Sequence, residues 1–320
     1  GSPMDADYAS QRVRWEPMYE MTQIKGDEET HPLLSPDDEF ADFESWDVAN
    51  LSGTSAKTPE MLRYEYARSA LKVGLELGRE IGVNPYKFGL YGTTDTHTAI
   101  PTTREDNYFG KYQHTEPSAN RHNIDVIPAE DPSLRIITAQ ESAAGLTAVW
   151  ARENTRQEVF GAITRKEAYA TTGSRIRVRV FGGWGFEESD LHAADFVSNG
   201  YRNGVPMGGD LTNIPDGASP RFLIRALRDS DGANLDRVQI IKGWLDAEGK
   251  SHERVYDVAV SGGREIGEDG RAREPVGNTV DLSIPTWTNT IGESELRGLW
   301  TDPDFDASRP SIYYARVLEI

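Results

Sequence analysis

Hydrophobic positions follow two different periods along the chain, and the change comes near Gly173. Between residues 58 and 81, apolar side chains recur every three or four positions, a spacing typical of one face of a helix. Thr58 and Pro59 suit the first positions of a helix, and Gly82 suits its end. The pattern therefore predicts one continuous helix over residues 58–81.

Short apolar runs flank this helix. Residues 18–24 and 87–91 have the length and composition of strands, and a helix that leads into a strand is typical of parallel α/β folds. Thr155 and Glu158 have the spacing of a capping box, which predicts a second helix that ends near residue 166. We therefore expect an α/β domain over residues 1–173.

After residue 173 the pattern has a period of two. Residues 175–181 alternate charged and apolar side chains, which is typical of a half-exposed antiparallel strand. Similar runs occur at 222–227, 238–244, 255–260, 279–284 and 312–318, separated by clusters of Gly, Asn and Asp. Several short strands with such turns predict a β-sandwich over residues 174–320.

Composition narrows the choice of partners. The chain has 320 residues, 52 of them acidic and 34 basic, with a net charge of -18. This charge disfavours binding to nucleic acid or to an anionic membrane. No apolar run approaches the length of a membrane span, so we expect a soluble protein. A chain without cysteine fits both a cytosolic protein and one exported, for example, to a bacterial periplasm. The sequence therefore leaves both compartments open.

The segment Gly92-Thr93-Thr94-Asp95-Thr96-His97-Thr98 carries the strongest chemical signal. It follows the predicted strand at 87–91, and ligands collect at the carboxyl ends of strands in α/β folds. A carboxylate and an imidazole two residues apart are suitable ligands for Zn, Mn or Fe. The alternative is a hydrogen-bonded polar turn. Since the chain has no cysteine, any metal must be bound by nitrogen and oxygen atoms.

The run FGLYGTTDTHTAIPTTREDNYFGKY (88–112) resembles DUF3604, an uncharacterised family related to the PHP (polymerase and histidinol phosphatase) metallohydrolases. Segments 14–47, 148–179 and 205–211 with 231–250 resemble the same family. PHP proteins have a distorted β/α barrel with a final Asp-x-His motif. The resemblance therefore implies that residues 1–173 form the carboxyl-terminal part of such a barrel, and that Asp95 and His97 bind metal.

Other polar residues could complete this site. Glu20, in the predicted strand at 18–24, and His31, in the loop after it, are candidates for further metal ligands or for hydrogen-bond partners of the ligands. The loop after Asp95 would lie at the catalytic end, where loops commonly bind substrate. The candidates for substrate binding are Lys25, Arg104, Glu105, Asp106, Lys111 and His114.

The resemblance also indicates that part of the site lies outside this chain. PHP proteins carry an Asp-x-His-x-His motif on their first strand, whereas none of the six histidines here forms a His-x-His pair. Gly1-Ser2-Pro3 resembles the remnant of an expression tag. We therefore expect the carboxyl-terminal portion of a longer protein, completed by its amino-terminal half, by a second copy or by extra contacts from residues 1–60.

Two functions remain open at this point. The first is a metal-dependent hydrolase of PHP type that acts on a small phosphoester, in which bound metal ions activate water. This chain alone should then be nearly inactive, because most ligands would come from the missing half. The second is a non-enzymatic module, in which the β-sandwich binds a glycan or another protein.

Overall fold

The computed structural model describes residues 4–104, 107, 111–113, 118–141, 145–284 and 286–320. The chain divides into two compact units, Gly1–Ser174 and Arg175–Ile320. The division falls one residue beyond the position at which the hydrophobic period changes. Each unit is described by itself.

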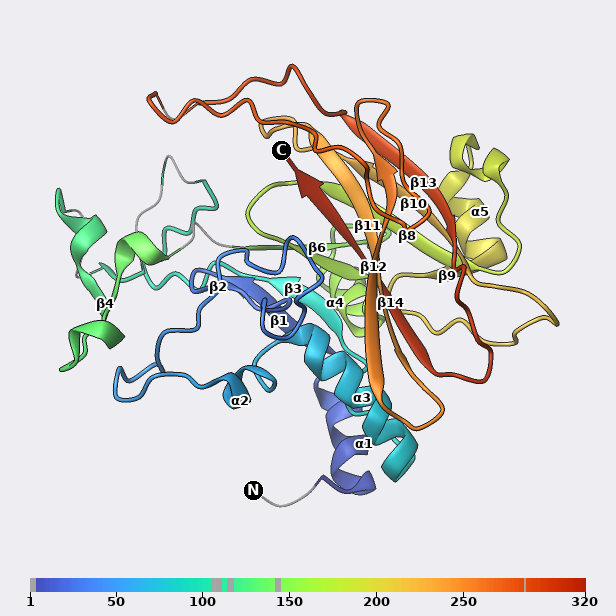
Figure 1. Cartoon of the computed structure of the whole chain (residues 1–320), viewed down its shortest axis with the longest axis horizontal. Helices are drawn as coiled ribbons and strands as arrows, with labels where there is room; N and C mark the ends of the chain where they lie inside the picture. The colour runs from blue at the N-terminus through green and yellow to red at the C-terminus, as the bar shows by residue number, and fades with distance from the viewer. Residues whose placement is uncertain (1–3, 105–106, 108–110, 114–117, 142–144, 285) are drawn as a thin grey trace. The chain divides into compact units, whose positions relative to one another are not determined.

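A three-stranded sheet of order β2-β1-β3 lies at the centre of the first unit (Figure 1). Strand β1 (Met18–Gln23) pairs antiparallel with β2 (Gly26–Asp27) and parallel with β3 (Gly89–Gly92). Helix α3 (Ala67–Ile81) precedes β3 and ends at Gly82, which has the left-handed φ of 79° that favours glycine. Because β1 and β3 run parallel, their carboxyl ends meet at one edge of the sheet.

The remaining elements of this unit are short. Strands β6 (Leu146–Val149) and β7 (Ala168–Thr171) pair antiparallel and are connected through α4 (Arg156–Thr164). Thr155 caps α4, since its side chain accepts a hydrogen bond from the backbone N–H of Glu158. The others are α1 (Ala6–Trp15), α2 (Pro59–Leu62), β4 (Asp125–Ile127), β5 (Ile136–Ile137) and the 3₁₀ turns at Arg121–Asn123, Pro132–Leu134 and Thr138–Gln140.

The prediction of a PHP-like β/α barrel is wrong. Within the described residues, the largest sheet of the first unit has three strands, and no sheet closes on itself. The helix-then-parallel-strand connection occurs once, between β1 and β3, whereas β4 with β5 and β6 with β7 pair antiparallel. The barrel was implied by the family resemblance and by the helix that leads into the strand at 87–91, but among the described residues that pattern gives one parallel pair and no closed sheet.

The predicted helix over 58–81 is also interrupted, and long-range hydrogen bonds explain the break. The backbone N–H groups of Ala67 and Arg68 donate to the carbonyl oxygens of Glu28 and Glu29, at 2.8 and 3.0 Å. These donors are therefore not used within a helix that continues from α2, and α3 begins anew at Ala67. Tyr66, at the junction, is buried.

The second unit contains two antiparallel sheets. One has the order β13-β10-β8-β9 and the other β12-β11-β14. The strands are β8 (Arg177–Gly183), β9 (Gly204–Pro206), β10 (Arg221–Leu227), β11 (Leu235–Leu245), β12 (Ser251–Val260), β13 (Glu295–Thr301) and β14 (Ser311–Glu319). Aromatic pairs connect the sheets: Trp300 lies 4.8 Å from Tyr256, and Phe222 lies 4.7 Å from Tyr313, between ring centroids. Helix α5 (Phe196–Asn203) and the 3₁₀ turn Glu188–His192 join β8 to β9.

Two strands of this unit differ from the predictions. Residues 279–284 form no strand; they have one isolated bridge, between Asp281 and Thr286, and Leu282 is 89% exposed. The apolar side chains that alternate along this segment are therefore not buried against a sheet. Strand β13 was not predicted, because Gly298 and the charged residues Glu295 and Arg297 obscure its apolar face.

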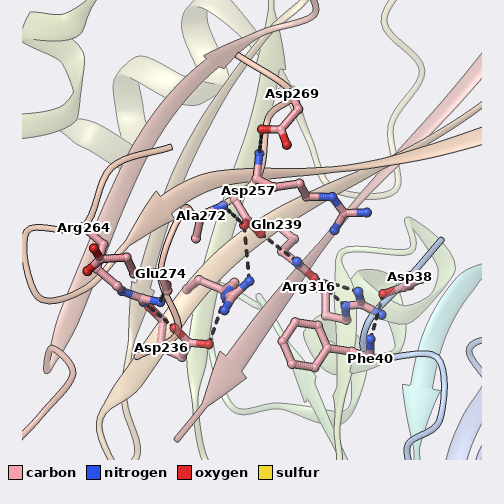
Figure 2. A network of polar contacts seen from close by, with 12 residues as sticks. Asp38, Phe40, Asp236, Gln239, Asp257, Arg264, Asp269, Ala272, Glu274 and Arg316 are labelled. Carbon is pink, nitrogen blue, oxygen red and sulfur yellow. Dashed lines mark hydrogen bonds and ion pairs between the residues drawn. The ribbon is translucent and has the colours of Figure 1, made fainter. Parts of the chain in front are cut away.

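Strand β11 carries a buried polar network in the second unit (Figure 2). The Asp257 carboxylate accepts hydrogen bonds from Gln239 Nε2 at 2.7 Å, from the Ala272 backbone N–H at 2.7 Å and from Arg237 Nη1 at 3.3 Å. Arg316 Nη2 donates to Gln239 Oε1 at 2.7 Å. Through the Ala272 N–H, the network holds the loop after β12 against strands β11 and β12.

Candidate functional site

Asp95 lies three residues beyond β3, at the carboxyl end of the strand, and has a left-handed φ of 44°. Its Oδ2 atom accepts hydrogen bonds from the ammonium groups of Lys25 and Lys111. Lys111 Nζ also donates to the backbone oxygen of Asp95 at 3.2 Å. The other carboxylate oxygen, Oδ1, lies 3.2 Å from Nε2 of His97. We call Lys25, Asp95, His97 and Lys111 the Asp95 cluster.

The two lysines reach Asp95 from different segments. Lys25 lies in the tight turn between β1 and β2, next to Gly26, whose φ is 112°. A side chain at Gly26 would place its Cβ 2.0 Å from the carbonyl oxygen of Glu44, so only glycine fits this turn. Lys111 lies where the chain returns alongside the site: its carbonyl oxygen accepts the N–H of His97 at 2.7 Å, and His97 forms a parallel bridge with Tyr112.

The electrostatic balance keeps Asp95 ionised. Burial alone would raise the pKa of this carboxyl group, but the hydrogen bonds and positive charges of Lys111 and Lys25 outweigh it and lower the pKa to about 2. One carboxylate thus faces two ammonium groups, so the cluster carries a positive charge in excess. The side chain of His97 is 50% exposed, whereas that of Lys111 is only 7% exposed.

Two glutamates lie on or next to the strands that flank the cluster, Glu20 in β1 and Glu28 directly after β2. Glu20 accepts a hydrogen bond from the hydroxyl of Thr93, two residues before Asp95. Glu28 is half-buried next to Tyr19, whose hydroxyl lies 3.3 Å from Glu28 Oε2. Burial is the main cause that raises the pKa of Glu28 to about 7, and the charge of Glu20 adds to it; the Tyr19 hydrogen bond and the charges of Lys57 and Lys25 act in the opposite direction. Sequence reasoning missed Glu28.

The remaining candidates have other partners, are exposed, or lie outside the described residues. Both ring nitrogens of His31 have protein partners, because Nδ1 accepts the N–H of Leu33 and Nε2 lies 3.1 Å from the Asp47 carboxylate. As described, His31 therefore presents no lone pair to a metal. Arg104 is exposed in the loop after Asp95. Glu105, Asp106 and His114 lie outside the described residues.

Asp95 and His97 fit two positions around a metal ion. With metal–ligand bonds of about 2.1 Å, two donor atoms on one ion lie roughly 3.0 to 3.4 Å apart, and Asp95 Oδ1 and His97 Nε2 are separated by 3.2 Å. Among the residues that the structure describes, no group of three or more His, Asp or Glu side chains is arranged to hold an ion. The described residues thus place one carboxylate oxygen and one imidazole nitrogen at this separation, with two ammonium groups on the second carboxylate oxygen.

Comparison with known proteins gives one match. The model of a family described as "protein of unknown function (DUF3604)" matches residues 1–320. No curated protein and no solved structure matches the chain. Among the described helices, none combines the length and the apolar composition needed to cross a lipid bilayer.

Proposed function

We propose that this chain, which belongs to the DUF3604 family of proteins of unknown function, is part of a metal-dependent hydrolase of phosphate esters. One observation carries the proposal: a carboxylate oxygen and an imidazole nitrogen lie 3.2 Å apart at the carboxyl end of β3, with two lysines on the same carboxylate. Metal ligands and phosphate-binding cations would thus lie within one cluster.

Each member of the Asp95 cluster has a role in this proposal. Asp95 Oδ1 and His97 Nε2 would hold a divalent ion such as Zn, Mn or Fe, which polarises a phosphoryl oxygen and lowers the pKa of a bound water molecule. His97 must then be neutral. Lys25 and Lys111 would contact the phosphate oxygens, because charge-assisted hydrogen bonds stabilise the charge that develops there.

The relation to PHP metallohydrolases belongs to this proposal as well. It is supported by the Asp-x-His spacing of residues 95 and 97, and it does not include a barrel. Since the described residues offer two metal ligands, we propose that the others come from the amino-terminal half of a longer protein or from a second copy. A small phosphoester substrate fits an excess positive charge within a chain whose net charge is -18.

The test combines metal content with turnover. The chain, and a longer parent protein where one exists, is equilibrated with Zn, Mn or Fe(II), and hydrolysis of p-nitrophenyl phosphate and its diester is followed. Asp95→Asn and His97→Ala should each lose bound metal and reduce turnover by orders of magnitude. His122→Ala removes an exposed histidine from the turn Arg121–Asn123 and serves as the matched control.

The outcomes separate the two functions. Unchanged metal content and turnover in both variants would refute the metal-dependent mechanism. A metal-free protein that binds a glycan or another protein through residues 175–320 would instead support a binding module.

A further inference from the structure

The loop between β12 and β13 carries an exposed hairpin. Asp281 and Thr286 exchange two backbone hydrogen bonds, at 2.8 and 3.3 Å, and the Thr279 hydroxyl donates to the carbonyl oxygen of Thr288 at 2.7 Å. Figure 1 shows this segment, in orange-red, extending beyond the strands of the second unit. Every described residue from 280 to 290 is exposed. We call residues 278–284 and 286–290 the arm.

The base of the arm is fixed to the second unit. The Asn289 side chain accepts the backbone N–H of Asn234 at 2.8 Å and donates to the carbonyl oxygen of Gly232 at 3.2 Å. The hairpin is therefore held by hydrogen bonds both at its base and along its length.

Large apolar side chains are exposed on the arm. Leu282 and Ile284, in the loop at the end of the hairpin, are 89% and 66% exposed. Val280 and Trp287, one step closer to the base, are 48% and 47% exposed. Single exposed apolar residues are normal on a protein surface, whereas four on one short hairpin indicate a contact surface.

The arm is also depleted of charge. Between residues 275 and 292 the sequence has one charged residue, Asp281, although 27% of the chain is charged. The Asp281 carboxylate accepts hydrogen bonds from the N–H and from the hydroxyl of Ser283, at 2.9 and 2.6 Å, and so holds the turn. The strong negative charge of the chain is therefore carried almost entirely outside the arm.

Backbone donors near the end of the arm have partners within it. These donors are the N–H groups of Val280, Asp281, Ser283, Thr286 and Thr288. A medium without water strongly penalises unpaired backbone groups. Because these N–H groups are already paired, they do not oppose the transfer of the end of the arm out of water.

We propose that the arm inserts its end into the surface of a lipid layer whose headgroups carry no net charge. The order of side chains along the arm supports this partner: aliphatic residues lie at the end, a tryptophan lies behind them, and hydroxyl and amide groups lie at the base. Hydrocarbon, interface and headgroups follow one another in the same order across a lipid leaflet, and tryptophan is enriched at the interface. A neutral lipid surface also avoids the repulsion that an anionic one exerts on a chain with a net charge of -18.

A second copy of the chain fits the arm less well. Two chains of charge -18 repel each other, and one short hairpin contributes less than the roughly 1,000 Å² that a specific protein interface buries. Insertion of two aliphatic side chains into lipid needs no such area and gives weak, reversible binding. The inference does not depend on the proposed hydrolase function.

The experiment measures partition of the full chain into vesicles by co-sedimentation. The vesicles contain phosphatidylcholine alone or a mixture with phosphatidylserine. Phosphatidylcholine that carries bromine at different depths of its acyl chain reports the position of Trp287 by fluorescence quenching, and Trp287→Phe identifies the contribution of this residue. Leu282→Ser tests the arm, Leu282→Met is its conservative counterpart, and Ile214→Ser removes an exposed isoleucine elsewhere in the second unit.

We expect binding to phosphatidylcholine, with quenching of Trp287 that is strongest for bromine near the headgroup end. Leu282→Ser should lower the partition coefficient by about tenfold, because burial of one leucine side chain contributes at least that much. Leu282 is exposed, so its replacement should not affect folding. Leu282→Met and Ile214→Ser should leave the coefficient within about twofold. Phosphatidylserine should weaken binding, and added salt should restore it.

The inference fails if the chain does not bind phosphatidylcholine, or if Leu282→Ser binds as strongly as the unmodified chain. Binding that increases with phosphatidylserine would show that a charged surface, and not the arm, contacts the lipid. Sedimentation velocity provides the last outcome: a dimer that Leu282→Ser dissociates, formed by a chain that does not bind vesicles, would assign the arm to a second copy and overturn the lipid proposal.

Discussion

Asp95 in the first unit and Asp257 in the second each accept hydrogen bonds from several donors, and the two sites differ in whether they are closed to solvent. The side chain of Asp257 is fully buried, and its partners are an arginine, an amide and a backbone N–H. Nearby Asp236 pairs with both Arg237 and Arg264 (Figure 2). Asp95 instead has 26% of its side chain exposed and faces two ammonium groups and an exposed imidazole.

The difference shows how the same ion-pair chemistry serves two purposes. In the Asp257 network the groups are buried together, and removing Asp257 takes one buried partner from Arg237, Gln239 and the backbone of Ala272. In the Asp95 cluster, positive charge is in excess and solvent can reach His97. A ligand can therefore replace one of the internal partners there without leaving a buried group unpaired. A fully buried and fully paired network is typical of a structural role. A cluster that solvent can reach and that has charge in excess is typical of a binding site.

The largest expected effect concerns the closed network. Asp257→Ala should reduce the free energy of unfolding by about 3 to 5 kcal/mol, because Arg237, Gln239 and the backbone of Ala272 all lose a buried partner. Urea unfolding measures this change. Glu268→Gln, in the exposed part of the same loop, should remain within about 0.5 kcal/mol. A change below about 1 kcal/mol in Asp257→Ala would show that the network is not closed.

A smaller effect is expected at Glu28, where substitution should increase stability at neutral pH instead of reducing it. Its pKa is raised from 4.5 to about 7, so the folded state binds more protons than the unfolded state between these values. Stability that the protonated group contributes is fully present below pH 4.5 and is lost as pH rises to about 7. Glu28→Gln cannot ionise, and its stability relative to the unmodified chain should therefore rise by roughly 3 kcal/mol over this window.

Thermal or urea unfolding at a series of pH values measures that difference. The exposed variant Glu60→Gln should show no comparable gain with rising pH, since Glu60 is not buried. A constant difference between Glu28→Gln and the unmodified chain from pH 4.5 to 8 would mean that Glu28 is ionised in the folded protein like an ordinary surface glutamate.

Features that depend on residues close together in the sequence could be predicted. The position of Asp95 and His97 follows from an apolar run and the residues directly after it, and β3 ends within one residue of that run. The cap at Thr155 and the stop at Gly82 depend on neighbouring residues only, and both occur. Lys25 and Lys111 were expected to contact substrate phosphate.

The long-range parts could not be predicted. Lys25 reaches Asp95 because of a glycine turn, and Lys111 reaches it because residue 97 pairs with residues 111 and 112. The hydrophobic pattern of the sequence does not indicate these contacts. The carbonyl oxygen of Glu28 accepts the N–H of Ala67, 39 positions further along the chain, and this hydrogen bond also interrupts the predicted helix. In β11, Arg237 and Gln239 alternate with apolar residues as on an exposed face, yet both are buried.

The smallest expected effects on stability are at the Asp95 cluster. The pKa of Asp95 lies below the ordinary value of 3.8, at about 2, so the stability it contributes is present above pH 3.8 and is lost as pH falls through about 2. Asp95→Asn should therefore lower the free energy of unfolding at pH 7 by about 1 to 2 kcal/mol, because partial exposure screens the two lysines that lose their partner. His97→Ala should change it by less than about 0.5 kcal/mol, since the imidazole is half exposed. If Asp95→Asn destabilised the chain as strongly as Asp257→Ala, the Asp95 cluster would be a closed structural network, and the contrast between the two units would disappear.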